Sequence, residues 1–107
     1  MKELQQLQNE IKKWSDRTFG SDFDRREGMA AHLRKEVAEL QGEIVWNNKL
    51  GIQVELADCL MLILDIASHS GIDIDSLIFE VEHKLQINKL RKWGKTNPDG
   101  SIEHIKN

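Results

Sequence analysis

The sequence has few of the residues that break helices or that favour sheets. It has one proline, Pro98, and no tyrosine. Its one cysteine, Cys59, cannot close an intrachain disulfide, and the apolar neighbours of Cys59 indicate a small core residue in a reducing compartment. The longest apolar run is far too short to span a bilayer, and the start of the chain lacks the apolar segment of a secretory signal. We therefore expect a soluble, helical, cytoplasmic protein with no membrane partner.

The length of 107 residues suits a single domain over residues 1–107 with one modest core. Residues 1–83 carry 9 Lys+Arg against 16 Asp+Glu, or −7, whereas residues 84–107 carry 6 against 2, or +4. An acidic body with a short basic end lacks the broad basic face that binds nucleic acid. The pattern fits either a mixed-charge surface or a metal site beside an anion site.

Apolar residues recur at helical spacing in four segments. They cover residues 3 to about 17, about 25–47, about 52–69, and from an N-cap at Asp73 or Asp75 to about Trp93. Gly71 is the expected C-terminal cap of the third helix, and "NPDG" marks a turn in the tail. Helices with apolar stripes and short loops predict an all-α four-helix bundle. Because the third segment is apolar on nearly every side, we expect another subunit to cover it.

Two pairs of acidic residues lie where the second and third helices would face each other. Glu36 and Glu39 share a stripe at the edge of one apolar face, and Glu55 and Asp58 share a face of the other helix. Clustered carboxylates raise one another's pKa unless a cation joins them. Their hard oxygens suit Mg²⁺, with Mn²⁺ as the alternative. Glu36 and Glu39 alone would suggest an exposed acidic face, but the two pairs together favour a metal.

The fourth helix supplies groups of the opposite kind. Lys84, Asn88 and Arg91 recur at i, i+4 and i+7, which makes a cationic, amide-bearing stripe suited to phosphate oxygens. By itself this stripe is typical of a solvated helix C-terminus, where the helix dipole favours cations. Beside a carboxylate-bound metal, it indicates a site for a polyphosphate.

These motifs resemble those of a known family. "KEVAEL" followed by "ELAD" is similar to the EExxE…ExxD signature of the MazG-type all-α nucleotide pyrophosphohydrolases, and "KLQINKLRKWG" is similar to their K-x-x-x-N-x-x-R segment. "WSDRTFG", "HLRKE" and "DGSIEHI" look most like the small dATP/dGTP pyrophosphohydrolase branch of phages and bacteria. One position departs from the signature, because Lys35 stands where the first Glu of EExxE belongs. Lys35 points away from the Glu36/Glu39 stripe, so only the number of bound metals is left open.

The resemblance implies Mg²⁺-dependent hydrolysis of nucleoside triphosphates, purine deoxynucleotides in this branch, to the monophosphate and pyrophosphate. It also implies a homodimer or homotetramer in the cytoplasm of a bacterium or a phage-infected host. Carried onto this chain, it makes Glu36, Glu39, Glu55 and Asp58 the metal ligands, and it makes Lys84, Asn88 and Arg91 the phosphate-binding residues. Either Glu36 or Glu39 would accept the proton of the attacking water, and the phosphorus attacked stays open.

Four further residues are candidates for contact with the nucleotide. Trp14 and Phe19, in the resembling "WSDRTFG", are the best placed aromatic residues to stack on a base, although helix-spaced aromatic residues more often pack in a core or interface. His32 lies one turn before Glu36, where it would touch substrate, orient a carboxylate or simply face solvent. Asp65 would contact the sugar, support the metal ligands or make a structural hydrogen bond.

Two rival functions fit parts of the pattern. A carboxylate-bridged di-iron bundle needs two Glu-x-x-His motifs on different helices, and this chain offers only Glu80–His83 on a suitable helix. A non-catalytic helical interaction module would use the acids as a solvated face and the third helix as a dimer seam. In that case Glu55 and Asp58 would be structural residues.

Overall fold

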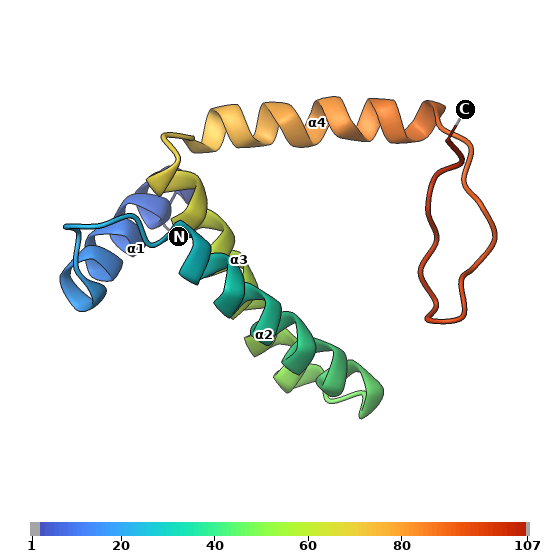
Figure 1. Cartoon of the computed structure of the whole chain (residues 1–107), viewed down its shortest axis with the longest axis horizontal. Helices are drawn as coiled ribbons and strands as arrows, with labels where there is room; N and C mark the ends of the chain where they lie inside the picture. The colour runs from blue at the N-terminus through green and yellow to red at the C-terminus, as the bar shows by residue number, and fades with distance from the viewer. Residues whose placement is uncertain (1–2, 107) are drawn as a thin grey trace. The chain divides into compact units, whose positions relative to one another are not determined.

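The computed structural model describes residues 3–106, in which four helices account for the regular structure (Figure 1). They are α1 (Leu4–Phe19), α2 (Arg26–Val45), α3 (Lys49–His69) and α4 (Ile74–Leu90). The all-α prediction is confirmed. Contacts divide the chain into a unit that ends at Ile74, in which α3 packs against both α1 and α2, and a unit that begins at Asp75. The single domain over residues 1–107 stays a prediction beside this division.

The turn between α2 and α3 is shorter than the sequence predicts. α2 ends at Val45 and not at Asn47, because Asn47 adopts a left-handed backbone with φ of 52°. α3 begins at Lys49 and not near residue 52, since the Asn48 side chain accepts a hydrogen bond from the Gly51 N–H at 3.3 Å and caps the first turn. The tight turn makes α2 and α3 adjacent helices, which is what brings their acidic faces together.

The end of α3 follows the prediction at Gly71. Its φ of 73° is a conformation that suits glycine. The Ile72 N–H donates to the Ala67 carbonyl at 2.8 Å, and the Gly71 N–H donates to the Ser68 carbonyl at 3.1 Å. This pair of bonds is a Schellman motif, which satisfies carbonyls at the helix end. α4 then begins at Ile74, directly after Asp73, the first of the two predicted N-caps.

The core of the first unit is small and contains the buried side chain of a glutamine, Gln8. Its buried apolar residues include Met29, Cys59 and Leu64, so the predicted burial of Cys59 is confirmed. Gln8 on α1 is fully buried, and its amide donates to the carbonyls of Leu64 at 3.4 Å and Ile72 at 2.9 Å. The Leu64 carbonyl lies in the C-terminal part of α3 and the Ile72 carbonyl just after it. The hydrogen bonds of Gln8 therefore hold α1 against the same helix that carries Glu55.

The second unit consists of α4 and a looped tail. α4 ends at Leu90 and not near Trp93, because Trp93 forms an isolated antiparallel bridge with His104 and its indole N–H donates to the Asn88 carbonyl at 3.0 Å. The turn predicted at "NPDG" is present, and the N–H of Asn97 donates to the Ser101 carbonyl at 2.7 Å. The tail therefore folds back on itself beyond the helix.

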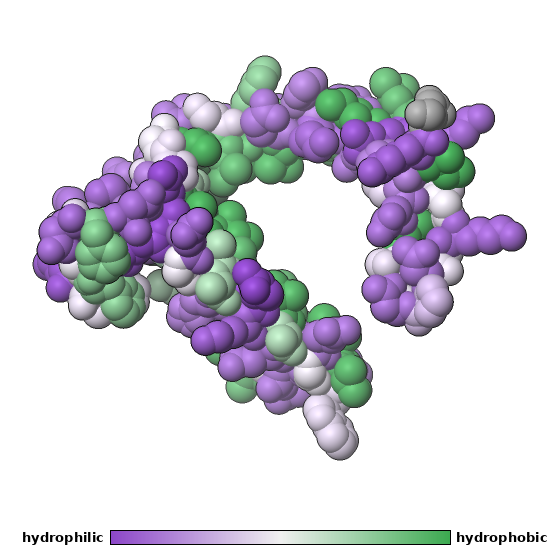
Figure 2. Space-filling model, in the orientation of Figure 1, coloured by the Kyte–Doolittle hydropathy of each residue, from purple (hydrophilic) through white to green (hydrophobic). Residues whose placement is uncertain are grey.

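Many large apolar side chains stay exposed in the isolated chain, as Figure 2 shows in green. In the apolar middle of α3, Leu60, Met61 and Ile63 are about half exposed, whereas their neighbour Leu64 is buried. α4 exposes Phe79, Val81 and Leu85. Among the described residues, none of the helices is long and apolar enough to cross a membrane.

Candidate active site

Three of the four predicted metal ligands form one cluster. Glu36 and Glu39 project from successive turns of α2, and Glu55 projects from the facing side of α3. Each offers a carboxylate oxygen, and these oxygens all lie within 4.8 Å of one another. The i, i+3 spacing puts the first two acids on one helix face, and the packing of α2 on α3 supplies the third. Lys35 is exposed and lies outside this acidic cluster.

Two buried carboxylate oxygens of the acidic cluster lack a compensating donor among the described residues. Glu36 Oε2 and Glu55 Oε2 are buried, and neither has a hydrogen-bond partner among residues 3–106. A hydrogen bond with Glu36, partial burial and the charges of Glu36, Glu39 and Asp58 raise the pKa of Glu55 to about 7. The same hydrogen bond with Glu55 lowers the pKa of Glu36. Two neighbouring carboxylates that each keep a buried oxygen without a hydrogen-bond partner among the described residues are suited to a hard divalent cation.

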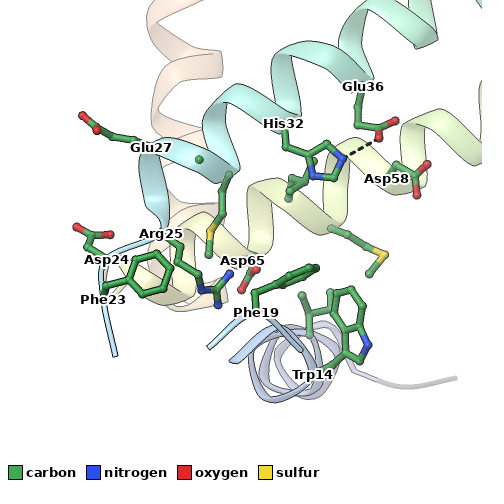
Figure 3. A pocket seen from close by; sticks show the side chains of 15 residues that line it. Trp14, Phe19, Phe23, Asp24, Arg25, Glu27, His32, Glu36, Asp58 and Asp65 are labelled. Atoms are coloured by element: carbon green, nitrogen blue, oxygen red, sulfur yellow. Dashed lines mark hydrogen bonds and ion pairs between the residues drawn. The ribbon is translucent and has the colours of Figure 1, made fainter. Parts of the chain in front are cut away.

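The fourth predicted ligand, Asp58, lies one turn after Glu55 on α3. It falls outside the group of three mutually close carboxylates, but its charge helps to raise the pKa of Glu55. Asp58 lines a cavity to which Glu36 also contributes (Figure 3). Asp58 therefore lies between the acidic cluster and the cavity, and its predicted role as a ligand stays a prediction.

The cavity has a volume of about 650 Å³ and borders the acidic cluster through Glu36. Trp14, Phe19, His32 and Asp65, the four residues predicted to contact a nucleotide, all line it. Apolar side chains make up most of the remaining wall, among them Ile11, Phe23, Met29, Met61 and Leu62. A partly apolar hollow with a few convergent polar groups is the usual form of a small-molecule site. The cavity and the acidic cluster together define the candidate active site.

Two aromatic residues of the cavity, Trp14 and Phe19, come from the C-terminal part of α1. Trp14 and Phe19 meet edge to face, with ring centroids 5.5 Å apart and planes at 85°. Trp14 is 47% exposed, so one face of its indole is open to a ligand. At the other side of α2, His32 Nε2 lies 3.0 Å from Glu36 Oε1, and this contact ties the cavity wall to the acidic cluster.

Arg25 also lines the cavity, although no sequence pattern indicated a role for it. Arg25 donates to the Gly20 carbonyl at 2.8 Å, to Ser15 Oγ at 2.9 Å and to Asp16 Oδ1 at 3.1 Å. Its guanidinium also lies over the Phe19 ring, 5.5 Å from the centroid. Because Arg25 precedes the first residue of α2, it belongs to no helical stripe, and periodicity could not single it out.

Asp65 is the most buried acid of the candidate active site. It is 5% exposed, and its Oδ1 has no hydrogen-bond partner among the described residues. His69 Nδ1 lies 3.1 Å from that oxygen, but it makes its hydrogen bond with the Asp65 carbonyl at 2.8 Å. His69 Nε2 lies 2.8 Å from Asp16 Oδ1. An imidazole nitrogen is therefore close to Asp65 Oδ1, but its hydrogen bond is with the Asp65 carbonyl.

The predicted phosphate-binding residues belong to the second unit. Asn88 Oδ1 accepts a hydrogen bond from Arg91 Nη1 at 3.2 Å, so these two side chains act together, while Lys84 is exposed one turn earlier. Arg91 follows the last residue of α4. The positions of the two units relative to each other are not determined, so the predicted meeting of this stripe with the carboxylates stays a prediction.

Known proteins resemble this chain over nearly its whole length. The family described as dATP/dGTP pyrophosphohydrolase matches residues 7–107. A dATP/dGTP diphosphohydrolase of Salmonella phage PMBT28 is 38% identical over 100 residues, which are 92% of this chain but 30% of that protein. A dATP/dGTP diphosphohydrolase of Cyanophage S-2L is 34% identical over 101 residues, which are 94% of this chain and 86% of that protein.

A solved structure is also similar to this chain. It is the Cyanophage S-2L MazG-like pyrophosphohydrolase bound to dGDP and three catalytic Mn²⁺ ions per active site. It superposes with a TM-score of 0.68 at 31% identity, and the match covers 95% of this chain and 92% of that one. The resemblance to MazG-type proteins inferred from the motifs is confirmed by this match and by the family.

Proposed function

Because the chain belongs to the dATP/dGTP pyrophosphohydrolase family, we propose that it hydrolyses dATP and dGTP to the deoxynucleoside monophosphate and pyrophosphate. The observation that carries this proposal is the junction of two features at Glu36. On one side lie three carboxylates, two of which have buried oxygens without a hydrogen-bond partner among the described residues, and on the other lies a cavity lined by aromatic side chains. A nucleotide has the same two ends, an anionic phosphate chain and a flat base.

The metal would be held by Glu36, Glu39, Glu55 and Asp58. Mg²⁺ is the expected ion, with Mn²⁺ as the alternative, and the donor set of carboxylate oxygens suits both. When bound, the ion supplies neutralisation of phosphate charge and a water of lowered pKa. The related cyanophage protein holds three Mn²⁺ ions per active site, and the carboxylates of this chain are numerous enough for more than one ion.

The other steps of the reaction would be carried out by residues that lie in different parts of the site. Glu36 or Glu39 accepts the proton of the attacking water, because both belong to the acidic cluster, and the lowered pKa of Glu36 keeps that carboxylate ionised. Lys84, Asn88 and Arg91 hold the phosphates and compensate their charge. Trp14 and Phe19 contact the base, and His32, next to Glu36, reaches the sugar or the α-phosphate.

The assembly we propose is a homodimer or a homotetramer. α3 and α4 expose large apolar side chains, including Leu60 and Ile63 on α3 and Phe79 on α4, which an isolated chain leaves in water. Light scattering coupled to size-exclusion chromatography should give two or four times the mass of 12.4 kDa. A monomer at micromolar concentration would contradict the proposed assembly.

The activity is tested by incubation with a panel of dNTPs and NTPs in Mg²⁺ or Mn²⁺, with chromatography that separates monophosphate and pyrophosphate from diphosphate and phosphate. We expect dAMP or dGMP with pyrophosphate. Glu55→Gln and Asp58→Asn should lose most of this activity, whereas Glu82→Gln, the same change on an exposed α4 acid, should keep it. Absence of turnover for every nucleotide, or full activity in Glu55→Gln, would favour the non-catalytic interaction module.

A further inference from the structure

Asp65 is a buried acid at the end of the cavity away from the acidic cluster, and its one ion-pair contact among the described residues is with His69, 3.1 Å from its Oδ1. Figure 3 shows Glu36 and Asp58 at one side of the cavity and Phe19, Arg25 and Asp65 at the other. The buried Oδ1 of Asp65 has no hydrogen-bond partner among residues 3–106. A buried carboxylate oxygen without a donor costs free energy, and a ligand that supplies an N–H would remove that cost.

Distance along α3 separates Asp65 from the phosphate end of the site. Asp65 follows Glu55 by ten residues, and a rise of about 1.5 Å per residue puts them roughly 15 Å apart along the helix. The ribose of a nucleotide is bonded to the α-phosphate, so it stays near the metal, while the base extends beyond it. The ligand atoms that reach Asp65 therefore belong to the edge of the base.

The other acids that line the cavity are poor candidates for contact with a base. Both oxygens of Asp24 bind the Arg26 guanidinium, at 2.7 to 3.1 Å, and the Asp24 side chain is 59% exposed. Glu27 is exposed in the first turn of α2. Asp65, by contrast, is buried next to the Phe19 ring and the Arg25 guanidinium in the cavity wall, where exclusion of water strengthens a hydrogen bond.

An ionised carboxylate only accepts hydrogen bonds, and this property selects among bases. Guanine presents two neighbouring donors, N1–H and the 2-amino group, which can meet both oxygens of one carboxylate. Adenine presents one amino group beside the lone pair of N1, which a carboxylate oxygen repels. The Arg25 guanidinium, fixed by its bonds to Gly20, Ser15 and Asp16, supplies donors on the same side of the cavity for an oxygen such as guanine O6.

The geometry points to Asp65 as the residue that determines base specificity, accepting hydrogen bonds from the N1–H and 2-amino groups of guanine so that the site prefers dGTP to dATP. This inference rests on the proposed function, because it assigns the cavity to the base of that substrate. It makes Asp65 a substrate-binding residue, where its contact with His69 alone would make it structural.

The experiment compares dGTP, dITP and dATP by kcat/KM in wild type, Asp65→Asn and the control Asp22→Asn, the same change on an exposed acid outside the cavity lining. In wild type, dGTP should exceed dITP, which lacks the 2-amino group, and should exceed dATP by about tenfold or more. In Asp65→Asn the amide offers one donor and one acceptor, which match adenine. The dGTP:dATP ratio should therefore fall by about tenfold or more, and Asp22→Asn should leave it unchanged.

Equal use of the three nucleotides by wild type, or a ratio that Asp65→Asn leaves unchanged, would overturn the inference. Equal use of the three nucleotides by wild type would overturn the inference even if Asp65→Asn does not fold. Calorimetric binding of dGMP and dAMP separates this inference from the proposed activity. Preference for dGMP without any hydrolysis would uphold the role of Asp65 and reject the hydrolase, whereas hydrolysis without base preference would do the reverse.

Discussion

Glu36 on α2 and Glu55 on α3 interact across the interface of their helices, which raises the pKa of Glu55 and lowers the pKa of Glu36, and each keeps a buried oxygen without a hydrogen-bond partner among residues 3–106. Two ionised carboxylates this close together in a partly dry site would repel each other and destabilise the folded chain. Protonation of one carboxylate reduces this repulsion at acidic pH, and a bound divalent cation would reduce it at neutral pH. The first two predictions follow from this relationship.

The stability of the metal-free protein should fall as pH rises through about 7. The pKa of Glu55 is raised in the folded state, so the folded chain binds a proton that the unfolded chain has released above its ordinary pKa of 4.5. The stabilisation is complete below pH 4.5 and is lost as pH rises through about 7. With chelator present, Glu55→Gln should have a higher Tm than wild type at pH 8.5 and a similar Tm at pH 5.5. A pH-independent difference between the two proteins would contradict this origin.

Addition of Mg²⁺ or Mn²⁺ should raise the Tm of wild type at pH 8, because an ion that binds only the folded chain stabilises it by mass action. At 100 times the dissociation constant the stabilisation is about 2.7 kcal/mol. Glu36→Gln, Glu39→Gln and Glu55→Gln should each reduce the shift, and Glu82→Gln should keep it. Ca²⁺ and Na⁺ at equal ionic strength control for screening, and an equal shift with Na⁺ would show that the effect is not specific binding.

Trp14→Ala should raise the KM for dGTP by at least about fivefold, because stacking of a base on an aromatic side chain contributes about 1–3 kcal/mol. Trp46 provides the matched control, since it is 84% exposed beyond the end of α2 and does not line the cavity. Trp46→Ala should leave the KM unchanged. Steady-state kinetics on both variants, with circular dichroism to confirm folding, makes the comparison. Equal effects of the two substitutions would remove Trp14 from the base site.

Arg91→Ala should weaken binding of the triphosphate more than binding of the monophosphate. A guanidinium paired with the Asn88 amide is arranged to contact phosphate oxygens, and the triphosphate offers more of them. Calorimetry with a non-hydrolysable dGTP analogue and with dGMP measures both affinities. Lys89→Ala, the removal of an exposed cation two residues earlier in the last turn of α4, should change neither by more than about twofold. A uniform loss of affinity for both nucleotides would place Arg91 outside the phosphate site.

Periodicity was sufficient for the helices and for the faces of the acids. The four helices, the cap at Gly71 and the shared stripe of Glu36 and Glu39 depend on contacts within one or two turns, so the order of residues specifies them directly. The helix ends at Val45, Lys49 and Leu90 were harder to predict from the sequence, because each depends on a particular side-chain hydrogen bond or backbone angle. The motifs also indicated the family, through spacings that helical geometry preserves.

The sequence by itself determined an all-α chain with two acidic helix faces, an aromatic segment at Trp14–Phe19 and a buried Cys59. Only the tertiary structure decided that Glu36 raises the pKa of Glu55, that Arg25 reaches the cavity from a loop, and that a buried oxygen of Asp65 has no hydrogen-bond partner among the described residues. The physical reason is that helical periodicity fixes which side of a helix a residue occupies. Charge coupling, cavity walls and unsatisfied hydrogen bonds depend instead on which helices pack together and at which height along their axes.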